Sequence, residues 1–229
     1  FVGLIVVSFL QFALFERNAA RYQAWIYPRW FDQVQYLTEA YQGHEYGLSH
    51  GFLAAVKHTL TNVSPQGTLH DFWALLVFSI TGPSRSAALA INLLGFLALQ
   101  ASLFVSVRRM TGGFTVAWMA LGFLMALKCP WSGGPASTVD FRLDWMAACA
   151  YGIALGAGIA TDAFRSTRWS VVFGAAVGVV LLTRTLTAVY FLLIFAALLT
   201  GLLSRADRWA RSGRLLGSAL IALALAGPA

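Results

Sequence analysis

Residues 86–107 read SAALAINLLGFLALQASLFVSV, a run of 22 residues without one charged side chain. A helix of roughly 20 apolar residues spans the hydrocarbon core of a bilayer, where every backbone polar group must be bonded internally. The whole 229-residue chain shares this character, with 59% hydrophobic and 11% charged residues and a mean hydropathy of +0.70. Soluble domains carry about 25% charged residues. We therefore predict an all-α membrane protein, a polytopic bundle of transmembrane helices.

Six further apolar runs are long enough to suggest crossings or parts of them. They are 1–15, 113–129, 143–161, 169–183, 186–203 and 214–229. The chain opens and closes inside such runs, so we expect about seven spans in a single domain, 1–229, that is a fragment with its first and last spans truncated. The long polar stretch 16–85 separates the first two spans. Within it, 50–60 is amphipathic and 69–82 is short for a crossing, so we predict two interfacial helices.

The distribution of charge predicts which side of the membrane each loop occupies. If 16–85 is outside, three turns fall inside: 108–112, 162–168 and 204–213. With Arg214 they hold eight basic and two acidic residues, whereas the outer side holds eight basic and seven acidic ones. Cytoplasmic loops carry the excess of Lys and Arg, so 16–85 is predicted to be the first extracytoplasmic loop. The net charge of +7 is thus assigned to membrane orientation and not to nucleic-acid binding.

Most acidic residues then fall on the outer side. They are Asp32, Glu39, Glu45, Asp71, Asp140 and Asp144. Carboxylates near a membrane are costly and are usually functional. Two groups of them, far apart in sequence, predict an active site on the extracytoplasmic face, covered by the first loop.

The first acidic group lies in FDQVQYLTEAY, residues 31–41. In a helix, one face would carry Asp32, Gln35, Tyr36 and Glu39. Shielded from water by Trp30, Phe31 and Tyr36, Asp32 would suit a general base that takes a proton from a hydroxyl. Tyr36 and Glu39 are candidate substrate-binding residues. The alternatives are that Asp32 only caps the helix and that Glu39 lies on a solvated face.

The second acidic group lies in PWSGGPASTVDFRLDW, residues 130–145. Its prolines and glycines predict a loop, with Asp140 just before the helix 143–161. Asp140 and Asp144 are four residues apart and would share a face, with Arg142 pointing elsewhere. Alternatively, Asp140 caps the helix or pairs with an Arg. Two oxygens at one helix end are weak evidence for a divalent metal, so we predict no metal site and no cofactor.

Arg184 interrupts the apolar run GVVLLTRTLTAVYF, residues 178–191, at the outer interface. The planar guanidinium suits a phosphate because it offers two charge-assisted hydrogen bonds. Snorkelling at a helix end is the alternative. The four histidines, His44, His50, His58 and His70, match no metal-site spacing and are expected at the interface or in solvent. The thiols of Cys129 and Cys149 are expected to be buried.

In their order along the chain, several motifs resemble one family. They are the acidic-aromatic motif at 27–41, FSITGPSRSAALAINLL (78–94), SVRRMTGGFTVAWMALGFLMALKCP (106–130), DFRLDWMAACAYGIALG (140–156) and FGAAVGVVLLTR (173–184). The sequence is similar to the polytopic GT-C glycosyltransferases. The resemblance is to family 39 and related bacterial enzymes, which include protein O-mannosyltransferases and lipid A aminoarabinose transferases. Many relatives carry two acids in succession where this chain has Asp32 and Gln33.

The resemblance implies a GT-C-like bundle in the bacterial inner membrane that transfers a sugar from a polyprenyl-phosphate carrier to an acceptor hydroxyl on the outer face. The acceptor would be a lipid, a glycan or a protein. Carried over to this chain, Asp32 and Asp140 are the catalytic acids, and Arg184 is the basic residue of the substrate site, to which Asp144 is added as a candidate. A secondary transporter or a non-catalytic membrane assembly protein is the alternative.

Overall fold

The structure, a computed structural model, describes residues 2–23, 31–61, 67–131, 137–203 and 206–227. These residues form helices and no strand, which confirms the all-α prediction. In chain order the helices are α1 (Val2–Gln23), α2 (Phe31–His50), α3 (Phe52–Thr61), α4 (Leu69–Thr81), α5 (Arg85–Thr111), α6 (Phe114–Ala126), η1 (Cys129–Trp131), α7 (Leu143–Ala160), α8 (Thr167–Thr183), η2 (Thr185–Thr187), α9 (Ala188–Leu203) and α10 (Arg208–Ala226).

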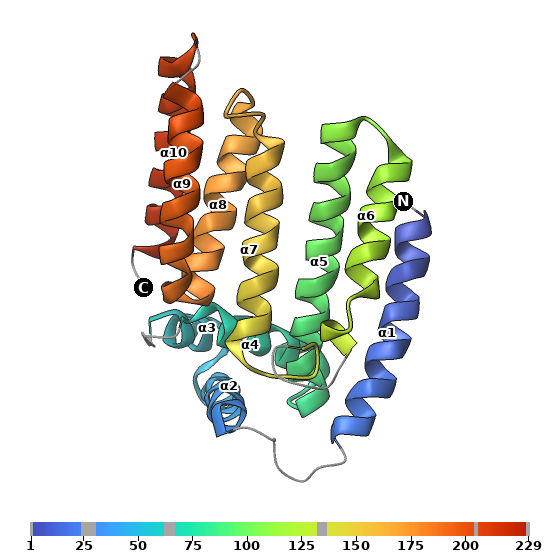
Figure 1. The fold of residues 1–229 in the computed structure, drawn as a ribbon. Helices are drawn as coiled ribbons and strands as arrows, with labels where there is room; N and C mark the ends of the chain where they lie inside the picture. The colour runs from blue at the N-terminus through green and yellow to red at the C-terminus, as the bar shows by residue number, and fades with distance from the viewer. Residues whose placement is uncertain (1, 24–30, 62–66, 132–136, 204–205, 228–229) are drawn as a thin grey trace.

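The helices form an up-and-down bundle with a separate layer at one end. Figure 1 shows α1 and α5 to α10 running lengthwise, while α2, α3 and α4 lie together at the lower end of the view. Helix α2 is drawn nearly end-on, so it lies across the direction of the bundle. Helix α4 has only 13 residues and packs against α2 and α5. The segment 69–82 therefore belongs to the layer at the end of the bundle, as its length predicted.

Four helices of the described chain are long and apolar enough to cross a membrane by length and composition. They are Val2–Arg21, Arg85–Thr111, Leu143–Ala160 and Thr185–Leu202. The other three predicted spans also form helices, but α6 has 13 residues and α8 has 17. Helix α10 spends its first two turns on the arginine-rich sequence RWARSGR. About seven crossings were predicted, and four are supported by helix length.

The two ends of the bundle differ in charge. The basic turns that follow α5 and α7, together with the start of α10, lie at the end away from α2, α3 and α4 (Figure 1). At the turn after α5, Gly112 adopts a left-handed backbone, with φ of 71°, and ends the helix just beyond Arg108 and Arg109. The residues before α7 lie at the opposite end, beside α2 and α4 (Figure 1). The separation that the charge pattern predicts is thus present in the fold.

One basic turn has an unusual backbone that two arginines hold in place. Residues 162–164 have φ of 53°, 50° and 62°, although none is glycine. Successive left-handed residues are costly for side chains with a Cβ atom. Arg211 Nη1 donates to the carbonyl of Ala163 at 3.3 Å, and Arg214 Nη1 donates to that of Phe164 at 2.9 Å. These bonds from α10 offset part of the strain and join the turn to the last helix.

Small residues let the long helices approach closely. Such residues are frequent where membrane helices pack closely, and α7 contains several of them in YGIALGAGIA, 151–160. In α7, a Cβ atom added to Gly156 would lie 2.5 Å from Ser102 Oγ of α5, and Ser106 Oγ donates to the Gly156 carbonyl at 2.9 Å. In α8, a Cβ atom on Gly174 would lie 2.5 Å from the carbonyl oxygen of Ser218 in α10. The pairs α5–α7 and α8–α10 therefore depend on these glycines.

Helix α4 begins against the end of α8. The backbone N–H of Thr68 donates to the carbonyl of Leu182 at 3.0 Å. Gly67 has φ of 112°, and a Cβ atom there would collide with the backbone of Leu182 and Thr183. Only glycine fits this approach without strain. The end layer is thus attached to α8 just before Arg184.

The two cysteines differ in their surroundings. Cys149 is buried in α7, as expected, with 1% of its surface exposed. The expectation of burial was wrong for Cys129, whose side chain is exposed. The reason is that α6 ends at Ala126, so Cys129 lies in the connection that follows and not inside a span.

Candidate functional site

A polar cavity of about 230 Å³ lies at the end of the bundle that carries α2. It is lined by Asp32, Tyr36, Arg142, Leu143, Asp144, Arg184 and Leu186. These residues come from the start of α2, the start of α7 and the segment from the end of α8 into η2, although these three parts of the chain are far apart in sequence. Four of the six predicted site residues thus share one cavity: Asp32, Tyr36, Asp144 and Arg184.

Arg184 and Asp144 form an ion pair across this cavity. Asp144 lies in the first turn of α7, and Arg184 follows the last residue of α8. Their side chains are 41% and 36% exposed, respectively. Ion pairs this open to solvent contribute little to stability because water competes with both partners. The guanidinium can therefore exchange Asp144 for another anion at small cost.

Asp140 does not line the cavity, because its carboxylate is turned inward. It is 1% exposed, and Arg142 donates to both of its oxygens, from Nε to Oδ1 at 3.0 Å and from Nη2 to Oδ2 at 2.7 Å. Gln33 Nε2 adds another bond, to Oδ1 at 2.7 Å. The hydrogen bonding of Arg142 to Asp140 raises the pKa of Arg142 above its usual value. A buried carboxylate with these bonds is held as a fixed anchor.

Two expectations for this segment were wrong. Helix α7 begins at Leu143, so Asp140 lies outside it and shares no helix face with Asp144. Arg142 does not point away, because its guanidinium forms an ion pair with Asp140. Pairing with an Arg was one of the alternatives for Asp140. The predicted loop residues Gly133, Gly134 and Pro135 lie outside the described part of the chain.

Asp32 is the most accessible acid of the cavity. It lies in the first turn of α2, where the helix dipole favours a carboxylate. The predicted shield is incomplete, because Phe31 is 81% exposed and points away from the core, while Trp30 lies outside the described residues. Tyr36 is 9% exposed. Burial raises the pKa of Tyr36, and the negative charges of Asp32 and Glu39 raise it further, which keeps the phenol protonated.

Glu39 lies one turn beyond the cavity and does not line it. It accepts a hydrogen bond from Gln35 Nε2 at 2.9 Å on the exposed face of α2. Its charge acts on Asp71 of α4, whose pKa is raised to about 7, mainly by burial and then by Glu39. The structure therefore places Glu39 beside the site, in a second acidic pair with Asp71.

His70 is buried beneath the cavity, where a solvated or interfacial side chain was expected. It is 0% exposed, and neither ring nitrogen has a hydrogen-bond partner among the described residues. Its ring lies 4.4 Å from that of Phe141 and 6.1 Å from that of Tyr36, centroid to centroid. Burial lowers the pKa of His70 to about 3, so the imidazole is neutral. The expectation failed because α2 and the segment before α7 cover the first turn of α4.

An apolar groove of about 720 Å³ adjoins the polar cavity. The two share Asp144, Arg184 and Leu186. The remaining lining residues of the groove are Ala147, Ala148, Tyr151, Thr187, Val189 and Tyr190. The groove thus runs between α7 and the start of α9, with the ion pair at its polar end. This arrangement suits a ligand that joins an anionic group to a hydrocarbon chain.

Sequence reasoning missed Gln33, Arg142 and His70. The role of Arg142 could have been recognised, because an Arg two residues after an Asp, outside a helix, can fold back and bond to that carboxylate. Within the described ranges, no group of three or more His, Cys, Asp or Glu side chains is placed to hold a metal ion. No protein-family model, curated protein or solved structure matches the chain.

Proposed function

We propose that the protein is a membrane glycosyltransferase of the bacterial inner membrane. It transfers a sugar from a polyprenyl-phosphate-linked donor to an acceptor hydroxyl on the extracytoplasmic face. One observation carries the proposal: Asp32, Arg184 and Asp144 line a polar cavity that continues into an apolar groove. A lipid-linked donor has the matching parts, which are a sugar, a phosphate and a hydrocarbon chain.

Arg184 is the phosphate-binding residue in this scheme. It is the cation common to the cavity and the groove. Arg142 also lines the cavity, but its fork is engaged by Asp140. The phosphate displaces Asp144 from Arg184, which costs little because that pair is exposed. The prenyl chain then follows the groove past Tyr151 and Tyr190.

Asp32 is the general base. It accepts the proton of the acceptor hydroxyl as the acceptor oxygen bonds to the anomeric carbon of the sugar. The bond between that carbon and the phosphate oxygen breaks, and the electron pair leaves with the lipid phosphate. Arg184 stabilises the negative charge that develops on this leaving group. Tyr36, protonated at neutral pH, is available to donate a hydrogen bond to a sugar hydroxyl.

Asp140 is a positioning residue and Glu39 a peripheral one in this proposal. Asp140 was the second predicted catalytic acid, but its buried carboxylate is fully engaged with Arg142 and Gln33. It fixes the guanidinium of Arg142 at the cavity wall. Its loss would act through Arg142 and through the stability of the segment before α7.

The test uses the full-length protein in proteoliposomes with a panel of undecaprenyl-phosphate sugars. Release of undecaprenyl phosphate reports turnover whatever the acceptor is, provided that a membrane extract supplies acceptors. We expect Asp32→Asn to lower turnover by at least about 100-fold, the usual contribution of a general base. Wild-type turnover in a normally folded Asp32→Asn protein would refute the assigned role.

The matched control compares the two ends of one helix. Arg184→Gln should lose about tenfold or more in affinity for undecaprenyl phosphate, because it removes a charge-assisted bond. Arg168→Gln, in the first turn of α8 at the opposite end of the bundle, should bind normally. Equal affinities for both variants would show that Arg184 does not bind the phosphate.

The same assay separates the alternative functions, because neither a transporter nor an assembly protein would release undecaprenyl phosphate.

A further inference from the structure

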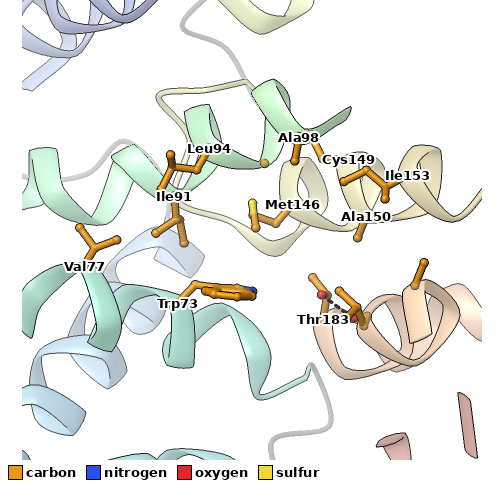
Figure 2. A pocket seen from close by; sticks show the side chains of 13 residues that line it. Trp73, Val77, Ile91, Leu94, Ala98, Met146, Cys149, Ala150, Ile153 and Thr183 are labelled. Atoms are coloured by element: carbon orange, nitrogen blue, oxygen red, sulfur yellow. Dashed lines mark hydrogen bonds between the residues drawn. The ribbon is translucent and has the colours of Figure 1, made fainter. Parts of the chain in front are cut away.

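A second apolar recess lies on a different face of α7 from the groove. Its volume is about 320 Å³. Side chains from four helices converge on it, as Figure 2 shows. They are Trp73 and Val77 of α4, Ile91, Leu94, Gly95 and Ala98 of α5, Met146, Cys149, Ala150 and Ile153 of α7, and Ala176, Val179 and Thr183 of α8. The recess and the groove have no lining residue in common.

The lining offers almost no polar group to a ligand. The hydroxyl of Thr183 is already used, because Oγ1 donates to the carbonyl of Val179 at 2.7 Å. The remaining residues are aliphatic or sulfur-containing, apart from Trp73, which is 38% exposed. A site of this size with so few polar groups in its lining holds hydrocarbon better than water.

The position of the recess in the fold indicates that this hydrocarbon is the chain of a membrane lipid. Its residues come from the halves of α5, α7 and α8 nearest the end layer, with α4 covering that side (Figure 2). Helices α5 and α7 are two of the four membrane-length helices of the described chain. In a bilayer, a recess lined by two such helices would lie at the depth of the acyl chains, which are the abundant apolar species there.

We propose that this recess is a binding site for one hydrocarbon chain of a membrane lipid, separate from the donor groove. The chain enters between α5 and α8 and lies against Met146, and its head group remains at the end of the bundle that carries α4. The proposal concerns binding alone, so it stands or falls independently of the transfer reaction.

The test is photo-crosslinking of the full-length protein in nanodiscs that contain phosphatidylglycerol with a diazirine in one acyl chain. Adducts are mapped by mass spectrometry of peptides. We expect enrichment on Trp73, Met146 and their neighbours over lipid-facing residues such as Leu192 and Leu193 of α9, which are 68% and 71% exposed. Equal labelling of the recess and of α9 would overturn the proposal.

The second part of the test fills the recess with a larger side chain. Ala98→Phe occupies its space and should lower the recess adducts about tenfold, because excluding two methylene groups accounts for that change. Ala101→Phe, on the same helix but outside the three cavities described, should leave them unchanged. Ala148→Phe fills the donor groove and should also leave them unchanged. If Ala98→Phe fails to fold, Leu94→Trp, at a position 56% exposed, replaces it. Unchanged adducts in a folded variant would refute the site.

Discussion

Arg184, which directly follows α8, is paired with Asp144 in the first turn of α7, and both residues line the polar cavity as well as the apolar groove. The pair joins two helices at the point where a charged ligand group would meet a hydrocarbon chain. Because both side chains are over one third exposed, the pair contributes little to stability, and Arg184 can exchange Asp144 for another anion.

Removing Asp144 should therefore strengthen anion binding. In Asp144→Asn, the phosphate of undecaprenyl phosphate no longer competes with a carboxylate for Arg184. An exposed pair contributes up to about 1 kcal/mol, so the affinity should rise by about threefold to fivefold. Binding to protein in nanodiscs, measured at two salt concentrations, checks this. Weaker binding would mean that Asp144 contacts the ligand and does not compete with it.

Removing Asp140 should destabilise the protein. Asp140→Asn leaves the guanidinium of Arg142, only 17% exposed, without its charged partner, and breaking a buried pair costs about 3 to 5 kcal/mol. The apparent melting temperature in detergent should fall by about 6 °C or more. The control is Asp207→Asn, which breaks the pair with Arg211, because Asp207 is 57% exposed and a small effect is expected. Equal shifts in the two variants would contradict the anchoring role.

Asp71 predicts a dependence of stability on pH. Its pKa is raised from 3.8 to about 7 in the folded protein, so the folded state binds the proton more tightly and stability falls as pH rises through that interval. Asp71→Asn should therefore raise the melting temperature more at about pH 8 than at about pH 5, by about 5 °C.

The pKa of His70 is shifted in the opposite direction to that of Asp71, so the two residues give opposite dependences of stability on pH. Its pKa is lowered from 6.5 to about 3, so its contribution to stability grows as pH rises through that interval. In the Asp71→Asn protein, stability should increase from about pH 5 to about pH 6.5, because only His70 remains of the two. A variant that keeps the pH profile of the unmodified chain would show that Asp71 is not buried as described.

The contact between α8 and α10 should not tolerate one added methyl group at Gly174. The new Cβ would meet the carbonyl oxygen of Ser218 at 2.5 Å, and backbone cannot give way as a flexible side chain can. Gly174→Ala should cost about 1 to 3 kcal/mol in unfolding free energy. Gly217→Ala, where no atom lies within 4 Å, should be neutral or stabilising. Thermal unfolding of the two single variants makes the comparison.

Cys129 offers a direct test of orientation. It carries an exposed thiol in η1, in the connection between α6 and α7. With Cys149→Ser, Cys129 should react with a membrane-impermeant maleimide added to intact spheroplasts. A single thiol in the basic turn after α7, from Arg165→Cys in a chain that lacks both native cysteines, should react only after lysis. The reverse pattern would place 16–85 in the cytosol and the proposed site on the wrong face.

Much of the fold followed from sequence because hydrophobic runs and turn residues act locally. The helical character of the apolar runs, the place of 69–82 in the layer at the end of the bundle and the separation of the basic turns all rest on such patterns. The number of membrane-length helices did not follow, because a hydropathy run does not show where a helix begins or ends. Helix α10, for example, spends its first two turns on arginine-rich sequence.

The candidate site was predictable in part. Asp32, Tyr36, Asp144 and Arg184 were predicted to share one site because the charge pattern assigned them to the same side, and all four line one cavity at one end of the bundle. Sequence could not separate Asp140 from them, since its inward direction depends on Gln33, which is 107 residues away. Nor could it show that His70 is buried, because the cover comes from Tyr36 and Phe141, which belong to other segments.

The bond between the Thr68 amide and the Leu182 carbonyl has a consequence for biogenesis. It fastens the end layer to the helical turn that precedes Arg184, so α4 cannot leave α8 without breaking a backbone bond two residues before that arginine. A chain whose later helices have inserted while α4 is still undocked lacks that attachment. If the proposed transfer reaction is correct, we expect such newly synthesised molecules to be inactive until α4 has docked.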